Sequence, residues 1–493
     1  MTPKRRPKVC LVLCPGWSPT SPALGPALLK AFLSSHGYET TSLDLAPLFI
    51  KAAPPEFGES IRRGDTMFLQ SKRLVAALML RLSPTVEEAA RRILACGPDV
   101  VGFTAYYTTW HMSVMLAKRL KELDPRISIV LGGPEGMRLF DMSGAPADDV
   151  QEMADIDAVV PGEGEIPLLN LLAEWNERGF SPCPGAYVKV DGRFVWREET
   201  PPVQDLDALP FPDFGDFDAG DYGGSRQLMT YFSRGCFKKC VFCDVENYWK
   251  NWRNRSGRRV VEEIDHLLAK HPEVDNFFFG DSLVNADLGE LLVFSRLMKE
   301  RMSEKRLPKV SWKGYAVVRP DMTPDACREL KAGGCDELWF GIESGSQKVL
   351  NAMKKGYKVG VGEAVLRNCR AAGIRTQVLL MAGFPTETAE DFDETLAFVR
   401  RNAADISNIC VGGYTYIDNG TALRKEAFSV YGVVEETFHP IFWTSRDGSN
   451  TFPERIRRLD ALYRCAQEEG MRVEAPPNRE RGLAAYEEWQ KNR

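Results

Sequence analysis

Short apolar runs alternate with stretches of helical spacing through the first 180 residues. Runs such as Val9–Leu13 and Val100–Thr104 are brief and apolar, as buried strands are. The other predicted strands are Thr40–Leu45, Ile127–Leu131 and Ile156–Val160. The intervening helices are predicted at Pro22–Ser35, Thr85–Ala95, Met112–Leu123 and Ile166–Trp175. This alternation predicts an α/β fold, with a doubly wound, Rossmann-like parallel sheet covered by helices.

A second alternation runs from about residue 225 to residue 420. Its predicted strands are Met229–Phe232, Asn276–Phe279, Val310–Tyr315, Glu337–Gly341, Thr376–Met381 and Ile406–Val411. Its predicted helices are Val260–Lys270, Leu288–Arg301, Thr323–Ala332, Gln347–Met353, Gly362–Ala372 and Thr388–Asn402. Six βα units predict a partial (β/α)6 barrel of the TIM type, with its chemistry at the carboxyl ends of the strands.

These patterns divide the 493 residues into four parts. Residues 1–180 form the doubly wound domain, and 225–420 form the partial barrel. Between them, 181–224 reads as a linker, because prolines and aspartates follow a predicted hairpin, Tyr187–Val190 with Arg193–Trp196. Residues 421–493 form a small, α-rich C-terminal segment, with a helix at Pro453–Glu469.

Composition narrows the class of protein. The net charge of −5 offers no general attraction for nucleic acid, and no apolar run is long enough to span a bilayer. The twelve cysteines are scattered without a disulfide pattern, which favours a reducing compartment. We therefore expect a cytoplasmic, globular protein without nucleic-acid or membrane partners.

Three cysteines carry the clearest chemical signal. Cys236, Cys240 and Cys243 follow an apolar run with the spacing C-x3-C-x2-C, and no fourth cysteine lies nearby. Four thiolates would close the coordination of an iron–sulfur cluster, whereas three leave one iron open to a further ligand. The trio therefore predicts a cluster with one exchangeable position.

Zinc is the alternative for this trio, but structural zinc prefers four ligands in two pairs. Cys327 is distant, and His266 and His271 do not repeat the pair spacing. The positive charges beside the cysteines are expected to favour their deprotonated form. They belong to Arg234, Lys238 and Lys239.

Glycine-rich turns follow four predicted strands of the first domain. A single such turn reads as an ordinary tight connection, but four at one sheet edge favour a groove for a bulky ligand. Phosphate alone is disfavoured, because neither G-x-G-x-x-G nor a P-loop occurs. The candidate contacts are Pro15, Gly16, Thr104, Tyr106, Gly132, Gly133, Pro134, Glu135, Gly162, Glu163 and Gly164.

With Phe242 just before its last cysteine, the trio resembles the radical S-adenosylmethionine (SAM) superfamily. Further motifs occur in that family's order: Phe278–Ser282, Gly341–Ser346 and Met381–Glu387, with Trp312–Tyr315 and Arg319–Met322 between them. The resemblance implies a [4Fe-4S] cluster on the three cysteines and SAM at these strand ends, with the adenine near Met381–Glu387. It implies SAM contacts from Phe242, Gly280, Asp281, Ser282, Glu343, Ser344 and Gly383.

The first domain resembles a cobalamin-binding domain, and the whole chain resembles the B12-binding class of radical SAM enzymes. The Asp-x-His-x-x-Gly motif that supplies a cobalt ligand elsewhere is absent, and neither His36 nor His111 has its context. The resemblance implies a cobalamin-dependent enzyme that methylates an unactivated carbon of a small molecule through a 5′-deoxyadenosyl radical. An external flavodoxin- or ferredoxin-like protein would supply electrons.

Two other functions stay open. The chain would otherwise be a radical SAM enzyme that performs oxidative cyclisation, rearrangement or 3-amino-3-carboxypropyl transfer. A non-catalytic sensor is disfavoured, because nothing resembles a DNA-binding helix pair. The substrate cannot be read from the sequence, and we identify no catalytic residue beyond the cofactor contacts.

Plainer structural interpretations compete at several positions. Asp281, Ser282 and Ser344 suit helix caps, and Glu387 suits the first turn of a helix. Five basic residues are predicted to form a solvent-exposed face: Lys250, Arg253, Arg255, Arg258 and Arg259. The C-terminal segment either closes over a substrate or packs as a cap, through Tyr414, Tyr416, His439, Trp443, Arg446 and Asp447.

Overall fold

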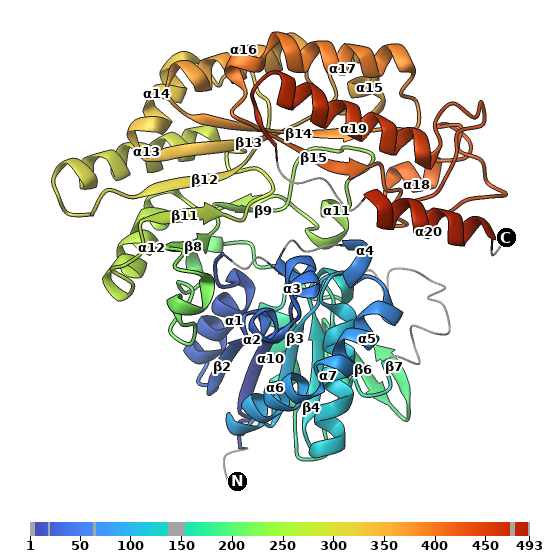
Figure 1. Ribbon diagram of the computed structural model, residues 1–493. Helices are drawn as coiled ribbons and strands as arrows, with labels where there is room; N and C mark the ends of the chain where they lie inside the picture. Colours follow the sequence, from blue (N-terminus) through green and yellow to red (C-terminus); the bar gives the residue numbers. More distant parts are fainter. Residues whose placement is uncertain (1–4, 18–19, 63–65, 137–152, 474–478, 492–493) are drawn as a thin grey trace. The chain divides into compact units, whose positions relative to one another are not determined.

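The computed structural model describes residues 5–17, 20–62, 66–136, 153–473 and 479–491 (Figure 1). The chain divides into two compact units. One comprises Met1–Met229 with Tyr248–Lys250, and the other comprises Thr230–Asn247 with Asn251–Arg493. None of the described helices combines the length and apolar character needed to cross a membrane.

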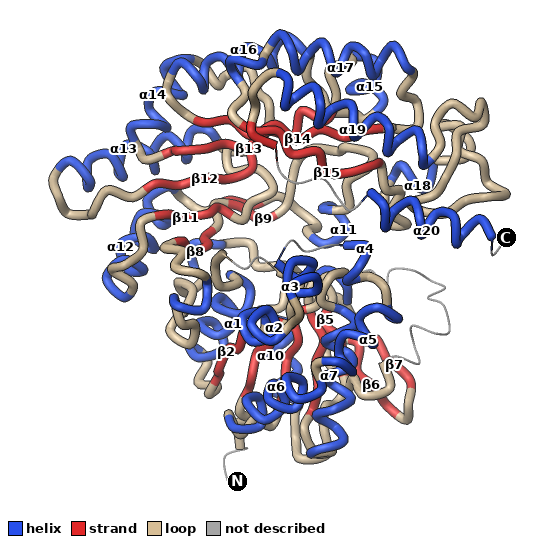
Figure 2. Tube along the Cα trace, viewed as in Figure 1, coloured by secondary structure: helices blue, strands red, loops and turns tan. Residues whose placement is uncertain are grey.

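The first unit contains a seven-stranded sheet in the order β2-β1-β3-β4-β5-β6-β7. Figure 2 draws its strands in red. Its strands are β1 (Val9–Leu13), β2 (Thr40–Asp44), β3 (Val100–Thr104), β4 (Ser128–Gly132), β5 (Ala158–Val160), β6 (Tyr187–Val190) and β7 (Arg193–Trp196). β1 to β5 run parallel, and β6 and β7 are antiparallel. The strand order reverses between β1 and β3, and open α/β sheets bind ligands at such a point.

Two groups of helices accompany this sheet. The described helices are α1 (Leu24–Ser35), α2 (Ala46–Ala52), α3 (Pro55–Arg62), α4 (Thr66–Leu69), α5 (Lys72–Arg81), α6 (Ser83–Ala95), α7 (Trp110–Leu123) and α10 (Glu165–Glu174). α1 contacts α10, whereas α6 contacts α2, α5 and α7. Right-handed crossovers to either side of β1 place α1 and α6 on opposite faces, so the predicted double winding is confirmed.

Two parts of this unit differ from the sequence-based expectation. Helices α2 to α5 had no predicted counterpart, and Pro47, Pro54 and Pro55 interrupt the pattern at α2 and α3. The predicted hairpin forms, with Asp191 and Gly192 both at positive φ, but β6 pairs with β5 and extends the sheet. The first unit therefore continues beyond residue 180, through the stretch predicted as a linker, to Met229.

The second unit contains a seven-stranded sheet in the order β16-β15-β14-β13-β12-β11-β8. Its strands are β8 (Gln227–Thr230), β11 (Asn276–Phe279), β12 (Ser311–Ala316), β13 (Cys335–Glu343), β14 (Arg375–Ala382), β15 (Asn408–Tyr414) and β16 (Arg472–Val473). Neighbouring strands from β11 to β16 are parallel. β9 (Ser233–Arg234) and β10 (Arg253–Asn254) form a separate antiparallel pair.

Helices follow the barrel strands as the alternating pattern predicted. They are α11 (Val245–Tyr248), α12 (Gly257–Lys270), α13 (Leu288–Ser303), α14 (Pro324–Ala332), α15 (Gln347–Ala352), α16 (Val359–Ala371), α17 (Ala389–Arg401), α18 (Ala422–Glu426), α19 (Phe452–Glu468) and α20 (Arg479–Lys491). Ser256, Asp287 and Thr323 each cap the following helix by accepting a backbone N–H. The carboxyl ends of parallel strands lie at one edge, so the sheet brings the predicted motifs together.

The aromatic run in β11 splits between two environments. An aromatic run such as Phe277–Phe279 is more often core than cofactor contact and is assigned to the core from sequence. Phe277 and Phe279 are fully buried, and the Phe279 ring lies 5.4 Å from that of Trp312. Phe278 alternates to the other face, where its ring lies 5.2 Å from that of Trp339. The core assignment is therefore confirmed for two of the three residues.

Candidate functional site

The cysteine loop connects β9 to α11. All three cysteines are free thiols and half-buried. Between them, Val241 is buried; its N–H donates to the Met353 carbonyl at 3.2 Å, and its carbonyl accepts from the Leu423 N–H at 2.7 Å. The middle of the loop is therefore anchored in the core, while the thiols stay accessible to a cluster.

The protonation of these thiols differs from the expectation. Burial raises the pKa of Cys236 and of Cys240, and raises that of Cys243 to about 12. Lys238 counteracts burial only in part, while Lys239 pairs with Glu246. The charge of Lys238 acts in the predicted direction on Cys236 and Cys240, but burial outweighs it in the metal-free chain, so iron has to displace the protons.

In the described part of the chain, no three His, Cys, Asp or Glu side chains gather closely enough to hold a single metal ion. A cube-shaped cluster requires no such convergence, because each thiolate binds a different iron atom. Three accessible thiols on one anchored loop therefore fit a cluster.

Asp281 holds the start of the cysteine loop. Its carboxylate is 1% exposed. It accepts hydrogen bonds from the Phe232 N–H at 2.7 Å, the Ser233 N–H, and the Ser233 hydroxyl at 2.7 Å. The helix-cap interpretation of Asp281 and Ser282 is wrong, because Asp287 caps α13. The SAM contact predicted for Asp281 would have to share a carboxylate that the loop already uses.

A buried arginine supports the same segment from the other side. Arg255 donates to the Tyr231 carbonyl at 3.0 Å and to Glu263 at 2.6 Å, and Glu263 also accepts from the Thr230 hydroxyl. Arg255 and Arg253 are both buried. The predicted solvated basic face is therefore wrong at these two positions, which support the polypeptide ahead of the cysteines.

Glu343 ends β13 in a strained conformation. Its φ is 67°, which is unusual for a residue other than glycine. Its carboxylate pairs with Lys355 at 3.2 Å. Gly341 makes room for this pair, because a Cβ there would lie 2.7 Å from Glu343 Oε1.

Sequence reasoning missed Lys355, which lies near the predicted SAM contacts. Its side chain is 11% exposed, and its Nζ lies 5.8 Å from the centre of the Phe242 ring. Burial lowers the pKa of Lys355, but the charges of Glu343 and Cys240 outweigh it, and the pKa is raised. The site thus contains a buried cation between a strained carboxylate and the cysteine loop.

The next predicted contact, Ser344, is buried against α17. Its hydroxyl lies 3.1 Å from that of Thr395, which also accepts the Gly345 N–H at 3.0 Å. Gly345 is required there, because a Cβ would lie 2.6 Å from that of Phe398. Ser346, rather than Ser344, is the N-cap residue of α15.

Gly383 follows β14 at a φ of 74°. Its N–H donates to Glu387 at 2.7 Å, and its carbonyl accepts from Asn450 at 3.2 Å. A Cβ at Gly383 would overlap Arg455 Cγ. The side chain of Arg455, from the C-terminal segment, therefore fills the space beside Gly383.

The C-terminal segment packs as a cap where it contacts this loop. Trp443 is fully buried, in a core cluster with Phe384 and Val241. Glu387, predicted as a first-turn acid, instead pairs with Arg458 at 2.8 Å. The side chain of Tyr414 lies outside the described residues.

Replacing Gly383 by alanine is expected to destabilise the protein by about 2–5 kcal/mol. A left-handed conformation costs an L-residue about 1–2 kcal/mol, and the clash with Arg455 adds about 1–3 kcal/mol. Urea unfolding followed by circular dichroism measures the change. Gly448→Ala is the matched control, because its φ is 70° but no atom lies within 4 Å of the added Cβ. Equal unfolding midpoints would contradict the role of Arg455.

In the first unit, the predicted turns meet at the carboxyl edge of the sheet. A Cβ at Gly16 would lie 2.7 Å from the Thr108 carbonyl oxygen, and one at Gly133 would lie 2.7 Å from that of Ala105. Both glycines therefore let neighbouring turns pack closely, which is the plainer of the two interpretations. Whether they also contact a ligand stays a prediction.

Aromatic rings cover the point where the strand order reverses. Trp17, after β1, stacks on Tyr106, after β3, with ring centres 4.4 Å apart. The Trp17 Nε1–H is buried and finds no hydrogen-bond partner among the described residues. The Nε2 of His111 lies 3.0 Å from the Gln70 carbonyl oxygen.

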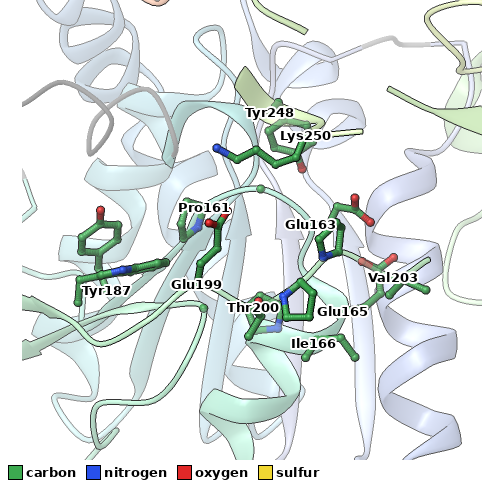
Figure 3. Close-up of a pocket in the computed structure, with 16 residues that line it drawn as sticks. Pro161, Glu163, Glu165, Ile166, Tyr187, Glu199, Thr200, Val203, Tyr248 and Lys250 are labelled. Carbon is green, nitrogen blue, oxygen red and sulfur yellow. The ribbon is translucent and has the colours of Figure 1, made fainter. Parts of the chain in front are cut away.

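A cavity of about 270 Å³ opens at the carboxyl end of β5 (Figure 3). Gly162 and Glu163 line it together with Tyr187, Glu199 and Lys250. Gly162 and Glu163, two of the residues predicted to contact a bulky ligand, therefore line a cavity beside the hairpin β6–β7.

Comparison with known proteins identifies the second unit. Residues 230–399 match the Radical SAM superfamily. An uncharacterized methyltransferase of Pyrococcus horikoshii is 26% identical over 331 residues, which are 66% of this chain and 69% of that protein. The anaerobic magnesium-protoporphyrin IX monomethyl ester cyclase of Rubrivivax gelatinosus is 27% identical over 347 residues, which are 65% of this chain but only 58% of the cyclase.

Structural similarity extends over both units. The radical SAM methyltransferase TsrM from Kitasatospora setae, solved with cobalamin and a [4Fe-4S] cluster, matches with a TM-score of 0.68 at 17% identity. The match covers 99% of this chain and 98% of TsrM and shows a shared fold. Residues 230–399 therefore form a radical SAM domain, which makes the chain an enzyme.

Proposed function

We propose that this protein is a cobalamin-dependent radical SAM enzyme that methylates an unactivated carbon of a small molecule. The observation that carries the proposal is the anchored loop with three free, half-buried cysteines in a radical SAM domain. When bound, the cluster supplies the electron that cleaves a carbon–sulfur bond of SAM, and cobalamin supplies the methyl group.

The residues of this chain would bind and orient these groups. Cys236, Cys240 and Cys243 would hold the cluster. Glu343 and Lys355 carry opposite charges 3.2 Å apart, and they suit the amino and carboxylate groups of SAM. Burial of the pair reduces competition from water and strengthens such contacts.

The first unit would hold cobalamin at the carboxyl edge of its sheet. The stacked Trp17 and Tyr106 offer a flat apolar surface at the point where the strand order reverses. The buried indole N–H of Trp17 has hydrogen-bonding capacity that the described protein leaves unused. The cavity bordered by Gly162 and Glu163 would receive a further part of this ligand.

A cyclase is the second candidate, because the Rubrivivax gelatinosus relative is named as one. Such an enzyme would use the same cluster and SAM contacts without transferring a methyl group. The two candidates differ in whether a methyl group from SAM appears in the product.

Protein purified without oxygen and reconstituted with iron, sulfide and hydroxocobalamin is expected to show absorption bands of both a cluster and a cobalamin. Replacement of Trp17 by alanine should weaken cobalamin retention and leave the cluster unchanged, because Trp17 lies in the first unit. Tyr107→Ala provides the control, since Tyr107 is an exposed neighbour of Tyr106. A cluster without cobalamin, even in excess, would contradict the methyltransferase proposal.

A further inference from the structure

A buried ion pair joins helix α19 to the loop that follows β14. Arg458 Nη1 donates to the Glu387 carboxylate at 2.8 Å and to the Glu387 carbonyl at 3.1 Å. The two side chains are 2% and 0% exposed. The same carboxylate oxygen accepts the Gly383 N–H at 2.7 Å, so Arg458 acts on both ends of the segment 383–387.

A second arginine of α19 secures the same loop. Arg455 is fully buried and donates to the Asn450 side chain at 3.2 Å. Asn450 in turn donates to the carbonyls of Gly383, at 3.2 Å, and Phe384, at 3.0 Å. The side chain of Glu387 therefore binds the N–H of Gly383, and the side chain of Asn450 binds the carbonyls of Gly383 and Phe384.

Arg455 is itself fixed by the preceding loop. Its guanidinium donates to the carbonyls of Ile441, at 2.8 Å, and Trp443, at 2.9 Å, and lies 3.8 Å from the centre of the Trp443 ring. These contacts leave α19 little freedom to move relative to loop 383–387.

Stability alone does not account for such an arrangement. A buried ion pair is often no more stabilising than well-packed apolar residues, because both charges lose their hydration. Burial outweighs even the charge of Arg458 and raises the pKa of Glu387 to about 7. The pair does give directional contacts, which fix the path of a loop more sharply than apolar packing.

We propose that Arg458 and Glu387 are positioning residues, which shape loop 383–387 to receive the nucleoside end of SAM. The inference rests on the proposed function, with the adenine near Met381–Glu387 as the family resemblance implies. Neither side chain needs to touch SAM, because both act through the backbone of 383–387. Affinity for SAM then depends on a helix some seventy residues later in the chain.

The test compares Arg458→Met with Arg457→Met in protein reconstituted with iron and sulfide under anaerobic conditions. Arg457 is the matched control: it pairs with Glu454, as Arg458 does, but is 64% exposed. Calorimetric titration is expected to show binding of SAM and of S-adenosylhomocysteine weakened about tenfold or more by Arg458→Met. Arg457→Met should bind both as the wild type does.

Two further readouts separate positioning from general damage. Iron content per chain should stay at the wild-type value. At saturating SAM, the electron paramagnetic resonance spectrum of the reduced cluster should also match the wild type, because the methionine end binds elsewhere. Arg458→Lys keeps the charge and one donor, so it should restore part of the affinity.

Wild-type affinity in Arg458→Met would overturn the inference, as would equal losses in both variants. If Arg458→Met does not fold, Glu387→Gln is the substitute variant, because it removes the charge of the pair but keeps an acceptor for the Gly383 N–H. Unchanged affinity for SAM in Glu387→Gln would also overturn the inference. Failure of the radical SAM chemistry is distinguishable, since the wild-type protein itself would then bind no SAM. Failure of methyl transfer alone would leave SAM binding, and therefore this comparison of variants, intact.

Discussion

Replacing Cys240 by alanine is expected to abolish the formation of 5′-deoxyadenosine. Two cysteines cannot hold three irons of the cluster, so the open iron that binds SAM is lost. The wild-type protein, incubated with SAM and dithionite without oxygen, should release 5′-deoxyadenosine, which chromatography with mass detection quantifies. Iron and sulfide per chain should fall in the variant.

Cys96→Ala is the matched control, because Cys96 is also a free, half-buried thiol but belongs to the first unit. It should keep wild-type iron content and activity. Normal 5′-deoxyadenosine release by Cys240→Ala would refute the cluster assignment. Methylthioadenosine from the wild type would instead indicate 3-amino-3-carboxypropyl transfer.

Much of the fold follows from local pattern. Strands β1, β3 and β11 have the predicted bounds, because each is a short apolar run that packs in a sheet. β6 and β7 also have them, because the Asp191-Gly192 turn between them is recognisable in the sequence. The cysteine loop and the strand-end motifs were predictable for a related reason. Their spacing is local, and parallel strands bring successive carboxyl ends to one edge whatever the details of packing.

The missed residues act over long distances in the sequence. A lysine after a short helix normally faces water, so nothing local distinguishes Lys355; its burial depends on Glu343 and the cysteine loop. Arg455 gave a weak signal, because it shares the helical stripe of Leu459 and Leu462, which are buried. A charged residue on an apolar stripe predicts a buried partner but does not identify it.

The position of Asp281 was predictable from the sequence, but its hydrogen-bond partners were not. The sequence placed it just after a strand, and the structure places it after β11, in contact with the segment that leads to the cysteine loop. Its carboxylate, however, is directed at the backbone of Phe232 and Ser233. Backbone N–H groups are common to nearly all residue types, so the sequence does not show which of them a carboxylate binds.

Asp281→Ala is expected to lower both the stability of the protein and its iron content. The substitution removes the acceptor of three buried donors, and each orphaned donor costs about 1–3 kcal/mol. The start of the cysteine loop would lose its anchor, so iron incorporation should fall together with stability. Ser282→Ala is the control, since it alters the next side chain of the same motif and should change stability by less than about 0.5 kcal/mol.

The destabilisation by Asp281→Ala should depend on pH. Burial raises the pKa of Asp281 to about 6, above its ordinary value of 3.8, so the folded state binds this proton more tightly than the unfolded state. The stabilisation from protonation is complete below pH 4 and is lost as the pH rises through 6, a change of roughly 3 kcal/mol. Alanine cannot bind the proton, so the difference in unfolding free energy between wild type and variant should be larger at pH 5 than at pH 7.5. Urea unfolding of the cluster-free proteins at both values measures it, and a difference independent of pH would show that Asp281 does not titrate in this range.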